Sequence, residues 1–231
     1  LTPSLLEVTV GGLDDYPLRG GDEFVYVMIS HELGGIRPSY TMADFRNEAA
    51  GDLVRGAYYT VRRARPDVGE VDLWVVDHEH HGSVADWMRI AEPVAPLAFW
   101  GPRRGFEIPA GVDDVLLIAD ETGFAAVAAT IETAAPGLRI LALLEAAGEH
   151  HRPPMPARPG LHSVWVNRGD DAPGTVNRLL EAVRSEVTGT PGAAFGAGES
   201  HHVSAIRRFL RTEIGMSADQ VSMTGYWRVA D

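Results

Sequence analysis

The chain has 231 residues, of which 45% are hydrophobic and none is cysteine, and its formal net charge is −12. Such a chain can bury one large core or two modest ones, and without cysteine it forms no disulfide, thiolate-bound metal or thiol nucleophile. All basic residues are arginines, and the acidic excess disfavours nucleic acid because phosphate backbones are repelled. No apolar run reaches the length of a membrane span and no signal pattern opens the chain. We therefore expect a globular, cytoplasmic protein, and a monomer.

The first hundred residues predict short β-strands interrupted by one helix. Runs rich in β-branched and aromatic residues, separated by Gly, Pro and Asp turns, fall at 5–12, 23–30, 57–64, 70–78 and 95–102. Regular spacing of this kind favours a small antiparallel barrel. The helix lies at 82–91, where Ser83 and Asp86 form a capping-box pattern. Its apolar residues repeat at helical spacing: Val84, Trp87, Met88 and Ala91.

From about residue 111 strands alternate with helices. The strands are predicted at 114–120, 138–146, 162–169, 193–199 and 220–228. The helices between them have apolar faces at Phe124, Val127, Ala128 and Ile131, then Val176, Leu179, Leu180 and Val183, and last Val203, Ile206, Phe209 and Leu210. The pattern predicts an open parallel α/β sheet, which binds ligands beyond the carboxyl ends of its strands. We therefore expect two domains, a β-barrel at 1–108 and an α/β domain at 109–231.

A β-barrel followed by an α/β sheet resembles the ferredoxin-reductase-like flavoproteins, and a motif makes the resemblance more specific. In that superfamily a barrel strand carries a tyrosine, followed by Ser or Thr, that packs on the flavin ring. Tyr59-Thr60-Val61-Arg62 resembles the Tyr-Thr-x-Arg motif of siderophore-interacting proteins, the FAD-dependent ferric-siderophore reductases. Further fragments resemble this family in the same order: "VVDH" ending at His78, "GSVADW", "GPRRGFEIP", "LLIADETGFAAVAATIE", "AFGAGESHHVSAIRRFLRTEIG" and "GYWR". The opening "LTPSLLEVTV" resembles the end of the family's first strand, so we expect a further strand before it.

The resemblance implies that the barrel binds FAD. Tyr59 would stack on the ring, Thr60 would hydrogen-bond to it, and Arg62 would bind the phosphates as a permanent, fork-shaped cation. The helix that opens at Gly82 would offer backbone N–H groups to the pyrophosphate. The full predicted cofactor set is Tyr59, Thr60, Val61, Arg62, His78, Gly82, Ser83, Val84, Asp120, Thr122 and Trp227.

Structural roles remain open for several of these residues. Arg62 could form only a salt bridge at the barrel rim, and Asp120 or Thr122 could cap the following helix. Trp227 could shield the flavin or cover the core.

The second domain is expected to bind NAD(P)H at the turns "DETG" and "GAGES". The predicted contacts are Glu121, Gly123, Gly198 and Glu199, although the turns lack a full dinucleotide fingerprint. Helical spacing directs Phe124 toward the core, which leaves the crevice open.

The implied function is electron transfer from NAD(P)H through FAD to a ferric siderophore, with release of Fe(II). Arg103, Arg104 and Arg228 are the candidate residues for binding the anionic siderophore. No acid, base or nucleophile is required, and the paired histidines lack the spacing of a zinc site, so we expect no protein-bound metal. The alternatives are a flavin reductase with another acceptor and a non-catalytic module that binds a siderophore or flavin.

Overall fold

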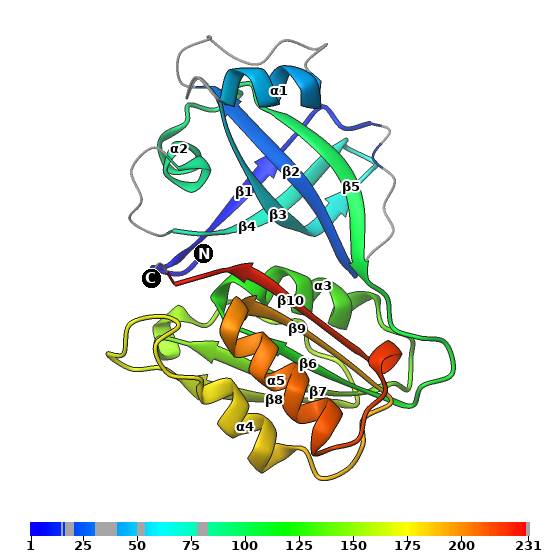
Figure 1. Ribbon diagram of the computed structural model, residues 1–231. Helices are drawn as coiled ribbons and strands as arrows, with labels where there is room; N and C mark the ends of the chain where they lie inside the picture. Colours follow the sequence, from blue (N-terminus) through cyan, green and yellow to red (C-terminus); the bar gives the residue numbers. More distant parts are fainter. Residues whose placement is uncertain (15, 17–20, 31–40, 50–53, 78–82, 230–231) are drawn as a thin grey trace.

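The computed structural model describes residues 1–14, 16, 21–30, 41–49, 54–77 and 83–229, which form two stacked sheet domains (Figure 1). The N-terminal sheet is antiparallel and consists of β1 (Leu5–Val10), β2 (Asp22–Ser30), β3 (Val54–Arg65), β4 (Glu70–Val76) and β5 (Ala98–Phe106). Its strand order is β1-β4-β3-β2-β5, so β1 and β5 are the two edges. The sheet curls into the predicted barrel around alternate apolar side chains of β2 and β4, such as Val25, Val27 and Leu73.

Two helices flank this barrel. In α2 (Val84–Ile90) the Ser83 hydroxyl accepts from the Asp86 N–H, and Val84 and Met88 are buried, as the sequence predicts. The helix α1 (Met42–Ala49) was not predicted. Its signal is a reciprocal cap, because Asp44 N–H donates to Thr41 Oγ1 and Thr41 N–H donates to Asp44 Oδ2.

The C-terminal sheet is parallel and has the order β10-β9-β6-β7-β8. Its strands are β6 (Asp114–Ala119), β7 (Arg139–Ala146), β8 (Leu161–Asn167), β9 (Ala193–Glu199) and β10 (Val221–Trp227). Figure 1 shows α4 (Arg178–Glu186) and α5 (Ser200–Thr212) on one face and α3 (Phe124–Thr133) on the face toward the barrel. The predicted boundary after residue 108 falls in the connection between β5 and β6.

The helix faces follow the predicted spacing, except that α3 is buried on all sides and that Val176 lies outside α4. Phe124 faces the core as predicted, with its ring edge-on to Trp165. All of α3 from Phe124 to Ile131 is buried, because the helix lies between the sheet and the barrel. The prediction of Val176 as a helix position is wrong, since Asn177 caps α4 through the Leu180 N–H and leaves Val176 outside.

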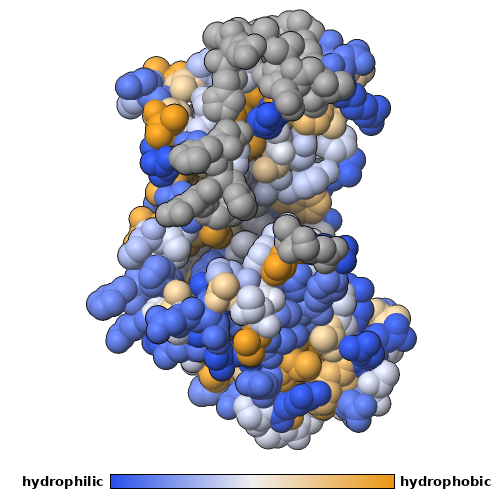
Figure 2. Space-filling model, turned by 60° about the vertical axis from the view of Figure 1, so that its left-hand side comes forward, coloured by the Kyte–Doolittle hydropathy of each residue, from blue (hydrophilic) through white to orange (hydrophobic). Residues whose placement is uncertain are grey.

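Hydrophilic residues dominate the C-terminal domain on the face shown in Figure 2, and the hydrophobic residues there form small, separate patches. Within the described ranges, no helix has the length and apolar character needed to cross a membrane.

Candidate functional site

A cavity of about 670 Å³ lies where the barrel meets the C-terminal sheet. The barrel side includes Tyr59, Thr60 and Trp74, and the C-terminal domain contributes Thr122 and the end of β10. The lining residues are Asp22, Phe24, Tyr26, Gly56, Ala57, Tyr58, Tyr59, Thr60, Trp74, Val76, Arg103, Gly105, Thr122, Thr224, Gly225 and Tyr226. The cavity therefore combines aromatic rings and hydroxyl groups from both domains with one arginine from the barrel.

The motif strand β3 brings Tyr59 and Thr60 to this cavity. Tyr59 also packs against the barrel core, and burial raises the pKa of its phenol well above the ordinary value. Thr60 is buried beside the C-terminal domain, with its Oγ1 3.3 Å from Tyr226 Oη. The indole of Trp74 is held by a 2.8 Å hydrogen bond from its Nε1 to Glu7.

Tyr226 and Asp22 connect the two domains at the cavity wall. Tyr226 Oη donates to Asp22 Oδ1 over 2.7 Å, which leaves Thr60 to donate to Tyr226. Asp22 is 2% exposed. Burial raises the pKa of this carboxyl to about 6, and the Tyr226 hydrogen bond opposes the rise. The pKa of Tyr226 is also raised, first by burial and then by the charge of Asp22.

Asp120 organises the turn that follows β6. Its carboxylate accepts from the N–H and hydroxyl of Thr122, from the Glu199 N–H, and from Trp227 Nε1. Burial raises its pKa despite these bonds. The helix-capping interpretation of Asp120 therefore holds, and Thr122 is the residue of this turn that lines the cavity.

Three of the four predicted nicotinamide residues are engaged in structural contacts. Glu121 accepts from the Ala147 N–H and pairs with Arg168 at 2.8 Å, while Arg168 also lies 3.4 Å from Glu145. Burial raises the pKa of Glu145 to about 7, opposed by the charge of Arg168. The Glu199 carboxylate caps α5 through the His202 N–H. A Cβ on Gly123 would lie 2.8 Å from Ala197 O, so glycine at this position permits the turn to pack on β9.

Gly198 has a positive φ of 158°, and a Cβ there would lie 2.6 Å from the Asp120 carboxylate. The residue therefore allows β9 to pass close to Asp120 at the sheet's ligand-binding edge.

Arg62 and Val61 line a separate cavity of about 170 Å³ next to α3. The Arg62 guanidinium is 5% exposed, lies 2.5 Å from Glu132 Oε2 on α3 and stacks on Trp74. The salt bridge that the sequence left open as a structural role for Arg62 is therefore present. Ser83 and Val84 begin α2 and line neither of these two cavities.

The three predicted siderophore-binding arginines are not brought together. Arg103 lines the interdomain cavity and stacks over the Trp100 ring at 3.9 Å. Arg104 pairs with Glu107 at 2.7 Å, and Arg228 contacts His201 Nε2 at 3.1 Å. Neither Arg104 nor Arg228 is among the residues that line the cavity.

His78, Gly82 and the "HEHH" segment at 78–81 lie outside the described residues. Among the residues that the structure does describe, no three His, Asp or Glu side chains are grouped as metal ligands.

The sequence predicted four of the residues that line the interdomain cavity, Tyr59, Thr60, Arg103 and Thr122, and missed the others, among them Asp22, Trp74 and Tyr226. Tyr226 was present in the "GYWR" motif, where Trp227 was chosen instead. Trp227 Nε1 donates to Asp120, and Tyr226 is the residue of this motif that lines the cavity.

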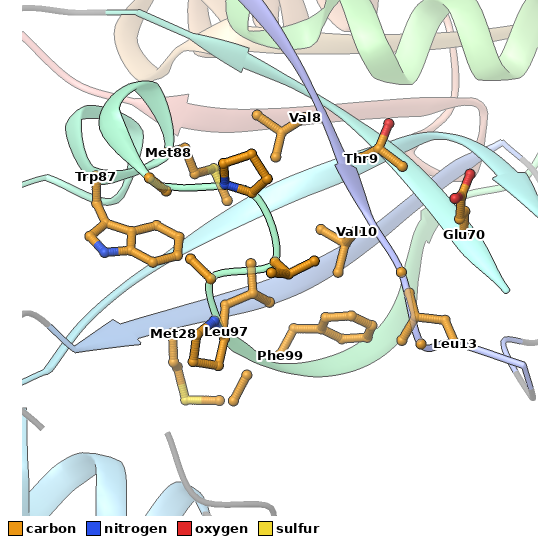
Figure 3. Close-up of a pocket in the computed structure, with 18 of the residues that line it drawn as sticks. Val8, Thr9, Val10, Leu13, Met28, Glu70, Trp87, Met88, Leu97 and Phe99 are labelled. Carbon is orange, nitrogen blue, oxygen red and sulfur yellow. The ribbon is translucent and has the colours of Figure 1, made fainter. Parts of the chain in front are cut away.

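A larger cavity of about 1300 Å³ lies in the barrel near its two edge strands (Figure 3). Figure 3 shows that apolar side chains such as Val8, Val10 and Phe99 surround it. Its lining residues within the described ranges belong to the N-terminal domain, and few of them carry groups that could orient a polar ligand. The interdomain cavity is smaller than this one, but its lining has the aromatic and polar groups expected of a binding site.

Two family models match consecutive parts of the chain. The "Siderophore-interacting FAD-binding domain" matches residues 1–106, and the "Siderophore-interacting protein" matches residues 112–230. The chain belongs to the siderophore-interacting protein family.

Individual proteins match along nearly the whole chain. The uncharacterised protein Rv2895c of Mycobacterium tuberculosis is 27% identical over 245 residues, which cover 99% of this chain and 86% of that protein. The siderophore-interacting protein SipS from Aeromonas hydrophila matches with a TM-score of 0.78 and 19% identity, covering 99% of this chain and 93% of its own. A ferredoxin reductase of carbazole 1,9a-dioxygenase matches with a TM-score of 0.68 and 17% identity, covering 98% of this chain and 66% of its own. The fold is therefore ferredoxin-reductase-like.

Proposed function

We propose that this family member is an FAD-dependent reductase that passes electrons from NAD(P)H to a ferric siderophore. The observation that carries the proposal is the interdomain cavity, where Tyr59 and Thr60 of the motif strand meet Thr122 and Tyr226. The reaction balances as NAD(P)H with two Fe(III) giving NAD(P)⁺, one proton and two Fe(II). Hard oxygen ligands hold Fe(III) better than Fe(II), so reduction releases the iron.

The cavity lining fits a flavin ring. Tyr59 and Trp74 supply aromatic surface, Thr60 and Tyr226 supply hydroxyl groups for the ring edge, and the volume lies in the range of small-molecule sites. Bound FAD would supply the conversion of a two-electron donor into single-electron steps. Arg62, with Ser83 and Val84, remains our proposal for the phosphates, and Arg62 would then exchange its Glu132 partner for phosphate oxygens.

The chain can also hold a proton beside the ring site. Thr60, Tyr226 and Asp22 form a hydrogen-bonded series, and the Asp22 pKa of about 6 permits proton uptake and release near neutral pH. The proton released by NAD(P)H oxidation could therefore pass from Thr60 Oγ1 through Tyr226 to Asp22.

One observation favours a second candidate, a flavin- or siderophore-binding protein that does not use NAD(P)H. The carboxylates of Glu121 and Glu199 are bonded inside the fold, and Gly123 packs against β9. Gly198 is then the predicted contact that remains for a nicotinamide.

Anaerobic absorbance spectroscopy separates these candidates. The purified protein is saturated with FAD and mixed with NADH, NADPH or dithionite, and a ferric siderophore is then added. The reductase predicts flavin bleaching by at least one nucleotide and recovery of colour with formation of Fe(II). Bleaching by dithionite alone would contradict NAD(P)H use and support the second candidate.

A further inference from the structure

Two carboxylates and one arginine are buried together at the carboxyl ends of three adjacent strands. Glu121 follows β6, Glu145 lies near the end of β7, and Arg168 follows β8. The three side chains, which we call the buried trio, belong to residues that are 8%, 3% and 8% exposed. One cation serves two buried carboxylates, so the trio carries a net negative charge when both are ionised. Because burial and a neighbouring like charge both disfavour ionisation, one of the two carboxylates should keep its proton to an unusually high pH.

The arginine is shared unequally between the two carboxylates. Arg168 Nη1 donates to Glu121 over 2.8 Å and lies 3.4 Å from Glu145 Oε1. Glu145 Oε2 and Arg168 Nε are buried and have no hydrogen-bond partner among the described residues. A protonated Glu145 has no charge that needs compensation, whereas an ionised Glu145 would attract the guanidinium. Glu145 is therefore the member of the trio that holds the proton in this arrangement.

The groups that face Glu145 agree with this assignment. Burial raises the pKa of Glu145 to about 7. The charge of Arg168, from the end of β8, opposes the rise, and the charges of Glu121 and Asp120, from the turn after β6, add to it. Asp120 differs from Glu145 because four N–H and O–H donors hold its carboxylate. Glu121 likewise accepts from Arg168 and from the Ala147 N–H.

The trio is connected to the interdomain cavity through the turn after β6 (residues 120–123). Glu121 ties this turn to the end of β7 by accepting from the Ala147 N–H over 3.1 Å. The next residue, Thr122, lines the cavity. A movement of Arg168 toward an ionised Glu145 would take the cation away from Glu121 and weaken the turn. The trio therefore has two arrangements between which a proton can select.

We propose that Glu145 is a proton-controlled switch for the turn after β6. With the proton bound, Arg168 holds Glu121, and Thr122 stays in place at the cavity wall. When the proton leaves to solvent, Arg168 turns to Glu145 and the turn opens more often. The consequence for the cofactor rests on the proposed function: FAD fits the cavity with the turn closed, so its affinity should fall as pH rises through neutrality.

Amide hydrogen exchange tests the switch without any ligand. The N–H groups of Ala147 and Thr122 are held by Glu121 and Asp120, so their exchange reports opening of the turn. After correction for the intrinsic effect of pH on exchange, we expect their protection in wild type to fall at least about fivefold between pH 6 and pH 8, the lower end of coupling between linked sites. Equal protection at the two pH values would overturn the proposal, and this comparison needs no variant.

Two substitutions of glutamate by glutamine assign the effect. Glu145→Gln fixes a neutral side chain and should keep the turn protected at both pH values. Glu149→Gln is the matched control, because Glu149 is exposed and lies four residues further along the same segment; it should behave as wild type. The assignment to Glu145 fails if the pH dependence survives in Glu145→Gln or disappears from both variants.

A cofactor titration separates this proposal from the function on which its consequence rests. FAD dissociation constants are measured by flavin fluorescence at pH 6 and pH 8 for wild type and both variants. Asp22 also titrates near the cavity, but it is present in all three proteins, so the comparison isolates Glu145. We expect the constant to rise at least about fivefold more in wild type and Glu149→Gln than in Glu145→Gln. An equal rise in all three proteins refutes the link to the cavity, while absence of FAD binding contradicts the proposed function and leaves the exchange result as the test of the switch.

Discussion

The two walls of the interdomain cavity use their polar residues in opposite ways. On the barrel wall, Tyr58 and Arg103 extend to solvent and Thr60 faces the cavity. On the C-terminal side, the carboxylates at the ends of β6 and β9 turn inward and do not line the cavity: Asp120 gathers four donors, and Glu121 pairs with buried Arg168.

The difference shows why charged residues at a sheet's ligand-binding edge are not by themselves ligand-binding residues. A buried carboxylate needs partners, and the turns after β6 and β9 supply those partners from within the domain. The barrel wall instead carries aromatic rings such as those of Phe24, Tyr26 and Tyr58, which line the cavity and need no charged partner. We therefore expect mutations of these inward-facing carboxylates and their partners to change stability. Mutations in the barrel wall should change binding.

Arg168→Met should have the largest effect. Removing this cation leaves Glu121 and Glu145 buried without it, and the free energy of unfolding should fall by about 3–5 kcal/mol. Arg139→Met is the matched control, because its pair with Asp114 at 3.0 Å is exposed and should contribute less than about 1 kcal/mol. Urea denaturation at pH 7.5 measures both. The inward-facing description is wrong if the two variants lose equal stability.

Asp22→Asn tests the position where the two walls meet. The folded pKa of about 6 lies above the ordinary value of 3.8, so Asp22 ionises more readily in the unfolded chain. Wild type therefore loses stability relative to the variant as pH rises from about 4 to 6, and the difference persists above that. The expected gain of the variant at pH 7, relative to pH 4, is up to about 3 kcal/mol. Unfolding free energies measured across this range should converge at low pH, and a constant difference between the two proteins would refute the raised pKa.

Adjacent residues of β10 should differ in their effect on FAD binding. Tyr226→Phe removes a hydroxyl from the cavity and should lower FAD affinity by about 0.5–1.5 kcal/mol. Trp227→Phe removes the hydrogen bond to Asp120 and should lower stability with little change in FAD affinity. Flavin fluorescence titration and thermal unfolding of both variants provide the readouts. The reverse pattern would restore Trp227 as the ring contact.

Much of the fold was predictable because its signals are local. The continuous apolar run of β6 and the Ser83–Asp86 cap each reflect contacts within a few residues. The helix α1 was missed although Thr41 and Asp44 form a reciprocal cap, since its apolar face is short.

The site was less predictable because its pairings are long-range. Glu121 lies 47 positions from Arg168, and Arg62 lies 70 positions from Glu132. Neighbouring strand residues also point to opposite faces. "GYWR" therefore identifies the β10 segment, and which of Tyr226 and Trp227 reaches the cavity depends on the position of Asp120.

The proposed function requires FAD to bind in the interdomain cavity rather than in the larger barrel cavity. Thr224→Trp places a bulky ring at an exposed position of the interdomain lining, and Glu92→Trp does the same in the barrel cavity. FAD dissociation constants are measured by flavin fluorescence for wild type and both variants. We predict that Thr224→Trp weakens binding by about tenfold or more, equivalent to about 1.4 kcal/mol, and that Glu92→Trp binds as wild type does. Weakened binding in Glu92→Trp with unchanged binding in Thr224→Trp would contradict the account.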